Sequence, residues 1–281
     1  MTILVTATSG PFGRLVVESL LASGVPANQI RAGARTVEKA ADLGVEVVHL
    51  DYSDPASLGT ALVGVDSLLL VSGSEVGQRV TQHGNVIDAA AAAGVSHLVY
   101  TSAPAATTSA LVLAPEHKAT EEAIAASGIP ATILRNSWYT ENYASVVEQA
   151  RSTGEIVSSV GDGRVASASR KDYADAAAAV LTNPEHIGAT YELSGDRAWD
   201  FTELAAVASD LIGSPVAYRA VSPAEHAEYL AAAGLDEGTA GFVVALDGNI
   251  RDGLLAVTTG DLGRIIGRPT TPLAEGLREA L

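Results

Sequence analysis

The sequence predicts an α/β fold built on a doubly wound parallel sheet. Along the first half, short apolar runs rich in β-branched residues alternate with longer segments of helical period. The strand-like runs are apolar throughout instead of alternating, which is typical of strands whose two faces are both covered by helices. The second half is less regular, and we expect it to interdigitate with the first.

Six strands are predicted in the first half, over residues 3–5, 30–34, 45–50, 67–71, 98–101 and 131–134. Helices are predicted between them, over residues 13–23, 38–43, 55–62, 78–93 and 116–126. Asp54 is placed to cap a helix just before Pro55, and Gly94 is placed to end another. Because parallel strands need long crossovers, these units predict a parallel sheet with helices on both faces. That is the Rossmann architecture of dinucleotide-binding proteins.

Elements of the second half are more widely spaced. A strand is expected over 165–169, a helix over 172–181 and a strand over 191–193, followed by helical segments over 201–212, 223–233 and 263–266. Ser169 and Asp172 have the spacing of a capping box at the start of the first of these helices.

The composition excludes several classes of function. The 281 residues include no cysteine, which excludes disulfide frameworks, thiolate zinc sites and a cysteine nucleophile. With 17 Lys and Arg against 33 Asp and Glu, the net charge of −16 disfavours a nucleic-acid partner. No histidine–carboxylate cluster has the spacing of a metal site. We expect a cytoplasmic protein without a membrane segment, since neither a signal-peptide pattern nor an apolar stretch of about 20 residues occurs.

A glycine-containing loop follows the first predicted strand and opens the first helix. Gly10 and Gly13 are spaced for a tight turn and a close helix–strand contact, and the helix N-terminus offers N–H groups to a pyrophosphate. Ala7 stands where a first glycine is usual, and Pro11 removes one possible donor. The sequence therefore predicts a dinucleotide-binding loop, with a βα turn that binds nothing as the alternative.

The residue after the second strand distinguishes the two nicotinamide dinucleotides. NAD enzymes place an acidic residue there to bind the ribose 2′-hydroxyl, whereas this chain has Arg35. A planar guanidinium suits a 2′-phosphate, which favours NADPH as the cofactor. Asp51 and Tyr52 follow the third strand, where adenine normally packs, although an Asp51 that only caps a turn is the alternative.

The chain lacks the usual acid–base pair of short-chain reductases. None of its eight tyrosines is followed four residues later by a lysine, so a Tyr-x-x-x-Lys pair is absent. His117, at the start of a predicted helix, is the best remaining candidate for proton transfer. A structural histidine outside the cleft is the alternative.

Several segments resemble a known family. Residues 74–79 read SEVGQR, residues 134–143 read LRNSWYTENY, and residues 266–273 read IGRPTTPL. These segments resemble the NmrA-like atypical short-chain dehydrogenase/reductases, the group of the bacterial zinc-independent NADPH:quinone oxidoreductases and of triphenylmethane reductase. The resemblance extends over the whole chain.

The resemblance implies an NADPH-binding Rossmann domain over residues 1–135 and 166–194. It implies a smaller α+β substrate domain over 136–165 and 195–281, with a substrate cleft between the two. Carried over position by position, the cofactor site comprises Ala7, Thr8, Ser9, Gly10, Pro11, Phe12, Arg35, Ser74, Glu75, Val76, Ser137, Trp138, Tyr139, Thr140, Glu141, Asn142 and Arg170. Trp138 and Tyr139 either wall the nicotinamide and stack on a flat acceptor or join the two lobes.

We therefore expect hydride transfer from NADPH to a quinone or a similar conjugated aromatic acceptor. A quinone needs little help from an acid, because negative charge spreads over its ring, and this agrees with the missing Tyr–Lys pair. Two alternatives remain open: a non-catalytic regulator that senses NADP(H), and a dedicated reductase of a polycyclic metabolite or dye. The acidic C-terminal half can carry a homodimer surface, although nothing in the sequence requires one.

Overall fold

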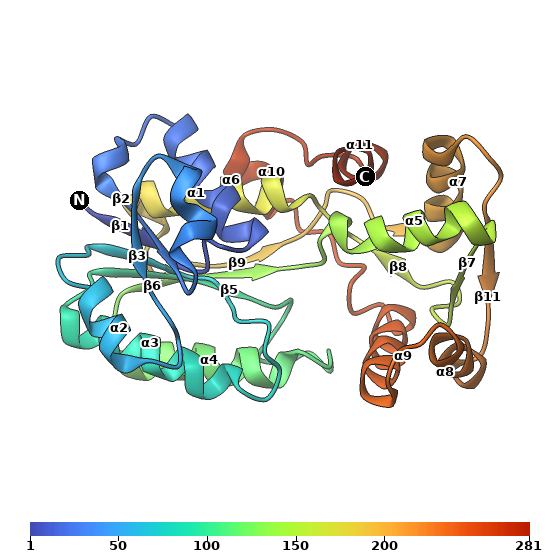
Figure 1. The fold of residues 1–281 in the computed structure, drawn as a ribbon, viewed down its shortest axis with the longest axis horizontal. Helices are drawn as coiled ribbons and strands as arrows, with labels where there is room; N and C mark the ends of the chain where they lie inside the picture. The colour runs from blue at the N-terminus through green and yellow to red at the C-terminus, as the bar shows by residue number, and fades with distance from the viewer.

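The computed structural model describes residues 1–281, and a seven-stranded parallel sheet forms the larger of its two lobes (Figure 1). The strand order is β3-β2-β1-β4-β5-β6-β9, and every neighbouring pair is parallel. The strands are β1 Ile3–Val5, β2 Ile30–Ala34, β3 Glu46–His49, β4 Ser67–Leu70, β5 His97–Ser102, β6 Ala131–Asn136 and β9 Thr190–Leu193. The strand order reverses direction at β1, and this is where ligands bind in open α/β sheets.

Helices cover both faces of the sheet, as the continuous apolar strands predict. One face carries α1 Pro11–Ala22, α6 Arg170–Thr182 and α10 Asp261–Ile266, and the other carries α2 Pro55–Ala61, α3 Arg79–Ala93 and α4 Ala114–Ser127. Within β1, Ile3 and Val5 enter the core beneath α1 and α6, while Leu4 enters the core beneath α2 and α3. All three side chains are fully buried, which makes β1 the centre of the lobe.

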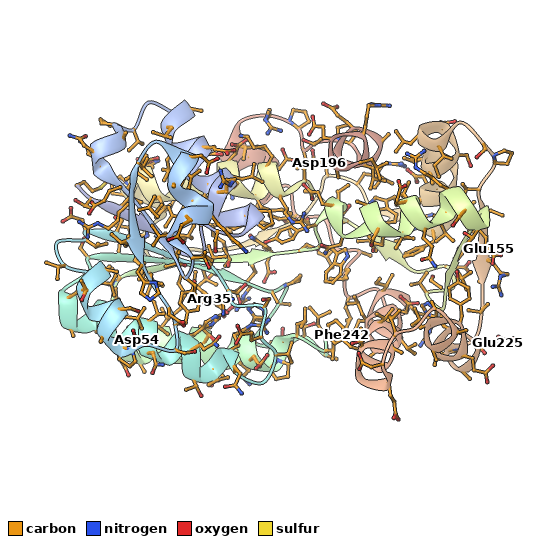
Figure 2. The ribbon with its side chains drawn as sticks, in the orientation of Figure 1. Arg35, Asp54, Glu155, Asp196, Glu225 and Phe242 are labelled. Atoms are coloured by element: carbon orange, nitrogen blue, oxygen red, sulfur yellow. The ribbon has the colours of Figure 1, made fainter.

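The predicted helix ends are confirmed in the first half. The Asp54 side chain accepts a hydrogen bond from the Ala56 N–H at the start of α2 (Figure 2), and Gly94 ends α3 with φ 74°. Ser169 accepts a hydrogen bond from the Asp172 N–H at the start of α6, but the carboxylate of Asp172 does not complete a capping box. It bonds instead to the C-terminal tail.

The second lobe packs around a small aromatic core. Its elements are α5 Ala144–Thr153, β7 Glu155–Ser158, β8 Arg164–Val165, β10 Trp199–Asp200, α7 Phe201–Ile212, β11 Ala217–Ala220, α8 Pro223–Ala232, α9 Glu237–Arg251 and α11 Leu273–Ala280. β7 pairs with β11 in parallel and β8 with β10 antiparallel. The rings of Tyr143, Trp199 and Phe201 contact one another at the centre, and Glu155 and Glu225 lie at the far end of this lobe (Figure 2).

Several sequence-based expectations were wrong in detail. Of the strand expected over 165–169, only Val165 belongs to a strand, and Ala168 makes a single bridge to Tyr139. The short helix expected over 38–43 is present and is a 3-10 helix. Three α-helices, α5, α9 and α11, had no expected counterpart. The 3-10 helices are η1 Ala27–Gln29, η2 Val37–Leu43, η3 Thr140–Tyr143 and η4 Pro184–His186.

We propose that the chain divides into domains near the boundaries stated above, with one adjustment. The helix α6 and strand β9 return to the sheet, as the interdigitated division requires. However, α10 lies within the range expected for the smaller domain, and its Leu262 is buried in the core of the larger lobe. Among the helices, none combines the length and the apolar character that a membrane span requires.

The carboxylate of Asp172 holds the C-terminal tail against α6. It is fully buried, accepts hydrogen bonds from the Thr271 N–H at 2.8 Å and the Thr271 hydroxyl at 3.1 Å, and pairs with Arg268 at 2.6 Å. Arg268 also pairs with Asp175, one turn farther along α6. A buried carboxylate is stable only when hydrogen bonds and an ion pair replace the water that it has lost, and these three contacts to Asp172 do so.

We expect Asp172→Asn to lower the free energy of unfolding by about 2 kcal/mol, because the amide leaves a buried donor or acceptor without a partner. Denaturant unfolding followed by circular dichroism measures the change. Asp42→Asn is the matched control, since Asp42 also pairs with an arginine, Arg14, but its side chain is 72% exposed. Equal midpoints for the two variants would contradict the role assigned to Asp172.

Candidate functional site

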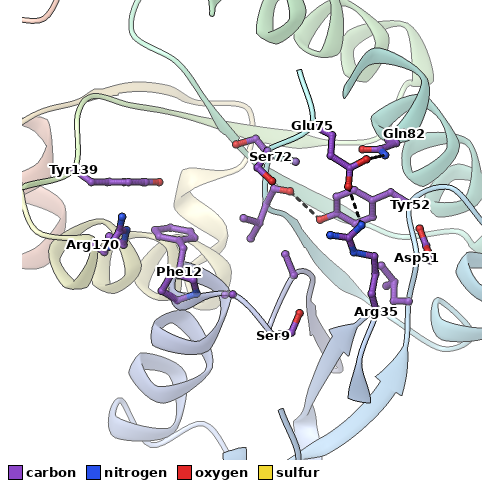
Figure 3. A pocket seen from close by; sticks show the side chains of 18 of the residues that line it. Ser9, Phe12, Arg35, Asp51, Tyr52, Ser72, Glu75, Gln82, Tyr139 and Arg170 are labelled. Atoms are coloured by element: carbon purple, nitrogen blue, oxygen red, sulfur yellow. Dashed lines mark hydrogen bonds and ion pairs between the residues drawn. The ribbon is translucent and has the colours of Figure 1, made fainter. Parts of the chain in front are cut away.

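A cleft of about 500 Å³ opens at the carboxyl ends of β1 to β4 (Figure 3). Its walls come from the β1–α1 loop, the end of β2, the segment after β3, the segment after β4, and the residues between β6 and α6. Figure 3 shows Arg35, Glu75, Tyr52 and Asp51 at one end and Tyr139 and Arg170 at the other. The cleft therefore lies where the strand order predicts a ligand site.

The floor of the cleft is the tight turn between β1 and α1. The Gly10 N–H donates to the Ala7 carbonyl at 3.0 Å, and Ala7 itself adopts a left-handed conformation with φ 54°. A Cβ added to Gly13 would lie 2.7 Å from the carbonyl oxygens of both Thr6 and Ala7. The turn therefore requires a glycine at position 13, whereas Ala7 occupies a backbone conformation that glycine adopts without strain.

The N-terminus of α1 faces the cleft without a side-chain cap. Gly10 is the N-cap residue, Pro11 is the first helical residue, and the first turn carries no acidic side chain. Gly10 to Gly13 all line the cleft. The N–H groups of Phe12 and Gly13 have no partner within the helix, and together with the positive end of the helix dipole they make this turn a site for an anion.

Arg35 is paired across the cleft. Its guanidinium donates to Glu75 Oε1 at 2.8 Å, and Gln82 donates to the other carboxylate oxygen, Oε2, at 2.9 Å (Figure 3). The hydrogen bonds from Gln82 and Arg35 lower the pKa of Glu75. Arg35 and Glu75 remain 62% and 45% exposed, so both side chains are free to change partners.

The segment after β4 is held from behind by side chains of the neighbouring elements. Thr101 Oγ1 accepts a hydrogen bond from the Ser72 N–H at 2.8 Å, and His83 Nε2 accepts one from the Gly73 N–H at 3.0 Å. The Nε of Arg79 donates to the Gly73 carbonyl at 2.9 Å. These bonds fix the backbone that presents Ser74 and Glu75 to the cleft.

Burial keeps His83 in the neutral form that this contact requires. Burial, together with the nearby Arg79 charge, lowers the pKa of His83 to about 3, so its Nε2 is free to accept at neutral pH. Its Nδ1 then donates to the hydroxyl of Thr120, 3.0 Å away. Arg79 is 6% exposed and pairs with Glu116 at 2.8 Å, and Glu116 also accepts from the Gly77 N–H.

An aromatic and cationic group closes the other end of the cleft. The rings of Phe12 and Tyr139 stack with their centroids 5.9 Å apart, and the Arg170 guanidinium lies 5.4 Å from the Tyr139 centroid. Arg170 also donates to Asn142 Oδ1 at 3.1 Å. Burial raises the pKa of Tyr139, so its hydroxyl stays protonated at neutral pH.

Most residues expected at the cofactor site line this cleft. They are Ala7, Ser9, Gly10, Pro11, Phe12, Gly13, Arg35, Asp51, Tyr52, Ser74, Glu75, Tyr139, Asn142 and Arg170. The cleft is also lined by residues that were not expected, namely Leu50, Val71, Ser72, Gly73 and Gln82. Four of these directly follow β3 or β4. Ligands of parallel sheets lie beyond the carboxyl ends of the strands, so including the first residues after each strand would have found them.

Six expected residues do not line the cleft. Thr8 is buried and donates its hydroxyl to the Gly33 carbonyl at 3.0 Å, and Thr140 is buried against Ser167. Val76 is 64% exposed and is not among the residues that line the cleft. The other three are Ser137, Trp138 and Glu141.

These three residues hold the surroundings of the cleft. Trp138 packs on the core of the second lobe, as expected for a residue that joins the two lobes. Its neighbour Tyr139 lines the cleft instead. The Glu141 carboxylate accepts from the Arg170 N–H at 2.8 Å at the start of α6. Ser137 lines a separate cavity of about 240 Å³ between the ends of β6 and β9.

His117 does not line the cleft, and the expectation that it does is not met. Its side chain is 5% exposed, and its Nδ1 lies 2.8 Å from the Tyr100 hydroxyl in the core between α4 and the sheet. Burial lowers its pKa to about 3, with smaller contributions from Arg79 and His83. In this position His117 contacts the core and not the cleft, which is the structural alternative.

Comparisons with known proteins agree on one group. The model of the NmrA-like family matches residues 1–239. Quinone oxidoreductase 2 of Escherichia coli (strain K12) is 46% identical over 278 residues, which cover 98% of this chain and 97% of the relative.

Two solved structures extend this similarity to the fold. The E. coli NADPH-dependent quinone oxidoreductase complexed with NADPH superposes with a TM-score of 0.94 at 46% identity, covering 99% of both chains. The Citrobacter sp. triphenylmethane reductase complexed with NADP(H) superposes with a TM-score of 0.91 at 41% identity, covering 100% of both chains.

We expect Gly13→Ala to destabilise the protein by about 1–3 kcal/mol, because the new methyl group would overlap two backbone carbonyls that the turn cannot move. Thermal unfolding measures the change. Gly59→Ala is the control, since Gly59 lies in α2 with open space around its Cα, and there alanine should stabilise the helix by up to about 1 kcal/mol. A Gly13→Ala protein as stable as the wild type would refute the close contact.

Ala7→Gly should have the opposite effect and stabilise the protein by up to about 1 kcal/mol. The left-handed conformation costs an alanine about 1–2 kcal/mol, and the greater freedom of glycine in the unfolded chain cancels part of that gain. Denaturant midpoints test the prediction against Ala91→Gly, at an exposed position in α3, which should lose about 1 kcal/mol. Equal losses at the two positions would show that Ala7 is not strained.

Proposed function

This chain belongs to the NmrA-like family, and on that premise we propose that it is an NADPH-dependent oxidoreductase that transfers hydride to a quinone or a similar conjugated acceptor. The observation that carries the proposal is Arg35 at the end of β2, in a cleft whose floor is the uncapped N-terminus of α1. A relative at 46% identity is a quinone oxidoreductase, and its structure contains NADPH.

The residues of the cleft fit NADPH along its length. The α1 N-terminus would bind the pyrophosphate, in a turn whose close contact with β1 depends on Gly13. Arg35 would bind the 2′-phosphate through paired N–H donors. Asp51 and Tyr52 would border the adenine, and Tyr139 would wall the nicotinamide end.

The titratable groups of the cleft support a quinone or a similar conjugated acceptor. Its charged lining residues are Arg35, Asp51, Glu75 and Arg170, and neither a histidine nor a lysine lines it. Burial raises the pKa values of Tyr52 and Tyr139, so neither side chain is adapted to exchange a proton near neutral pH. A site without such a group suits an acceptor that stabilises the incoming charge by itself.

Bound NADPH would supply the hydride, and one proton from solvent would complete the conversion of a quinone to a hydroquinone. The protein's part is to bind both reactants, to orient them and to exclude water from the region between them. Phe12, Tyr139 and Arg170 present flat surfaces at the end of the cleft, on which an aromatic acceptor can stack.

We expect the wild-type protein to oxidise NADPH in the presence of benzoquinones, and Arg35→Ala to weaken NADPH binding about 10- to 100-fold while NADH binding changes little. The loss corresponds to a charge-assisted contact to phosphate of about 1.5–3 kcal/mol. Absorbance at the reduced-nicotinamide band measures turnover, and cofactor fluorescence measures binding. A triphenylmethane dye in the acceptor panel tests for the alternative of a dye reductase.

Arg14→Ala is the control for this experiment. Arg14 directly follows the glycine turn, but it pairs with Asp42 outside the cleft. NADPH binding without turnover of any acceptor would favour the NADP(H)-sensing alternative. An equal effect of the two substitutions on the preference for NADPH over NADH would refute the assignment of Arg35.

A further inference from the structure

The arginine expected to bind the 2′-phosphate is occupied by an anion of the protein itself. Glu75 Oε1 lies 2.8 Å from Arg35 Nη1, within the cleft that both residues line. Any phosphate that pairs with this guanidinium has to displace the carboxylate or lie beside it. Two anions that share one cation repel each other, so the cost of displacement applies to a phosphorylated ribose and not to an unphosphorylated one.

The same carboxylate supplies a group that the end of β2 lacks. In enzymes that use NAD, an acidic residue at the end of the second strand accepts a hydrogen bond from the ribose 2′-hydroxyl. Here that position holds Arg35, and the carboxylate bonded to it comes from the segment after β4. Glu75 Oε1 is thus within hydrogen-bond distance of Arg35, the side chain expected to lie beside the ribose 2′ position.

The surroundings of Glu75 allow its side chain to move while its backbone stays in place. Ser72 and Gly73 are held by Thr101, His83 and Arg79, as described above. The Glu75 side chain is 45% exposed, and its second oxygen keeps a partner in Gln82 at 2.9 Å. The carboxylate can therefore turn from Arg35 toward solvent without disturbing the cleft wall.

We propose that Glu75 determines cofactor specificity in this cleft: it competes with the 2′-phosphate for Arg35, and it accepts a hydrogen bond from an unphosphorylated 2′-hydroxyl. This inference rests on the proposed function, since it assumes that a nicotinamide dinucleotide binds here. The site should therefore prefer NADPH over NADH less strongly than a site with an unpaired arginine would, and it should still bind NADH.

The test compares Glu75→Gln with the wild type by isothermal titration calorimetry, using adenosine 2′,5′-bisphosphate and adenosine 5′-monophosphate as probes. These fragments differ only in the 2′-phosphate, so the ratio of their dissociation constants reports on the 2′ position. Glu75→Gln should tighten binding of the bisphosphate about 3- to 10-fold, because the competing charge is gone. It should weaken binding of the monophosphate about threefold, because a neutral amide is a weaker acceptor than a carboxylate.

Glu46→Gln is the matched control. Glu46 also pairs with an arginine, Arg31, at 3.0 Å in the same lobe, but it does not line the cleft. The substitution makes the same change in net charge and should leave the ratio of the two dissociation constants unchanged. The KM ratio for NADPH and NADH should follow the fragments in each variant.

The outcomes separate this inference from the proposed function. If both fragments bind and Glu75→Gln leaves their ratio unchanged, or if Glu46→Gln shifts the ratio equally, the role of Glu75 is wrong while the NADPH site stands. If neither fragment nor either dinucleotide binds to the wild type, the proposed function fails and this inference fails with it. A shift of about tenfold in the ratio for Glu75→Gln alone supports the inference.

Discussion

The contact between the first turn of α1 and the end of β1 is the constraint on which the rest of the molecule depends. Gly13 brings the helix against the Thr6 and Ala7 carbonyls, closer than any side chain would allow. That approach sets α1 on the sheet beside α6 and leaves the helix N-terminus uncapped at the cleft floor. One close backbone contact therefore serves both the packing of the larger lobe and the binding of an anion.

Electrostatics in the cleft are balanced although the chain is strongly acidic. The protein has a net charge of −16, yet the cleft has two arginines against two carboxylates. A dinucleotide that brings several negative charges would thus depend on the helix dipole and on the redistribution of one ion pair. The buried groups behind the cleft, His83 and His117, are neutral because burial lowers their pKa values. They add hydrogen bonds without adding charge.

The sequence predicted the sheet well because its strands are buried on both faces, which leaves an apolar signature independent of tertiary detail. It predicted the cleft through the glycine turn and Arg35, since the ends of parallel strands share one edge. It could not show which face of α4 carries His117, nor which of the neighbours Trp138 and Tyr139 points into the cleft. The helix α9 was missed because its apolar face is interrupted by Asp247 and three glycines, so its period is weak. Such choices depend on packing against distant segments.

The path of the chain between the lobes has a consequence for how the protein folds. The chain enters the second lobe after β6, returns at α6, leaves after β9, returns at α10 and ends with α11 on the second lobe. Neither lobe is a continuous stretch, so no truncation isolates one of them. The core beneath α1 and α6 needs Leu262, and the core of the second lobe needs Leu277, whereas the core beneath α2 and α3 is built from residues 4–124 alone. Contacts so distant in sequence slow folding, and the segments that cross between the lobes couple the stability of one lobe to that of the other.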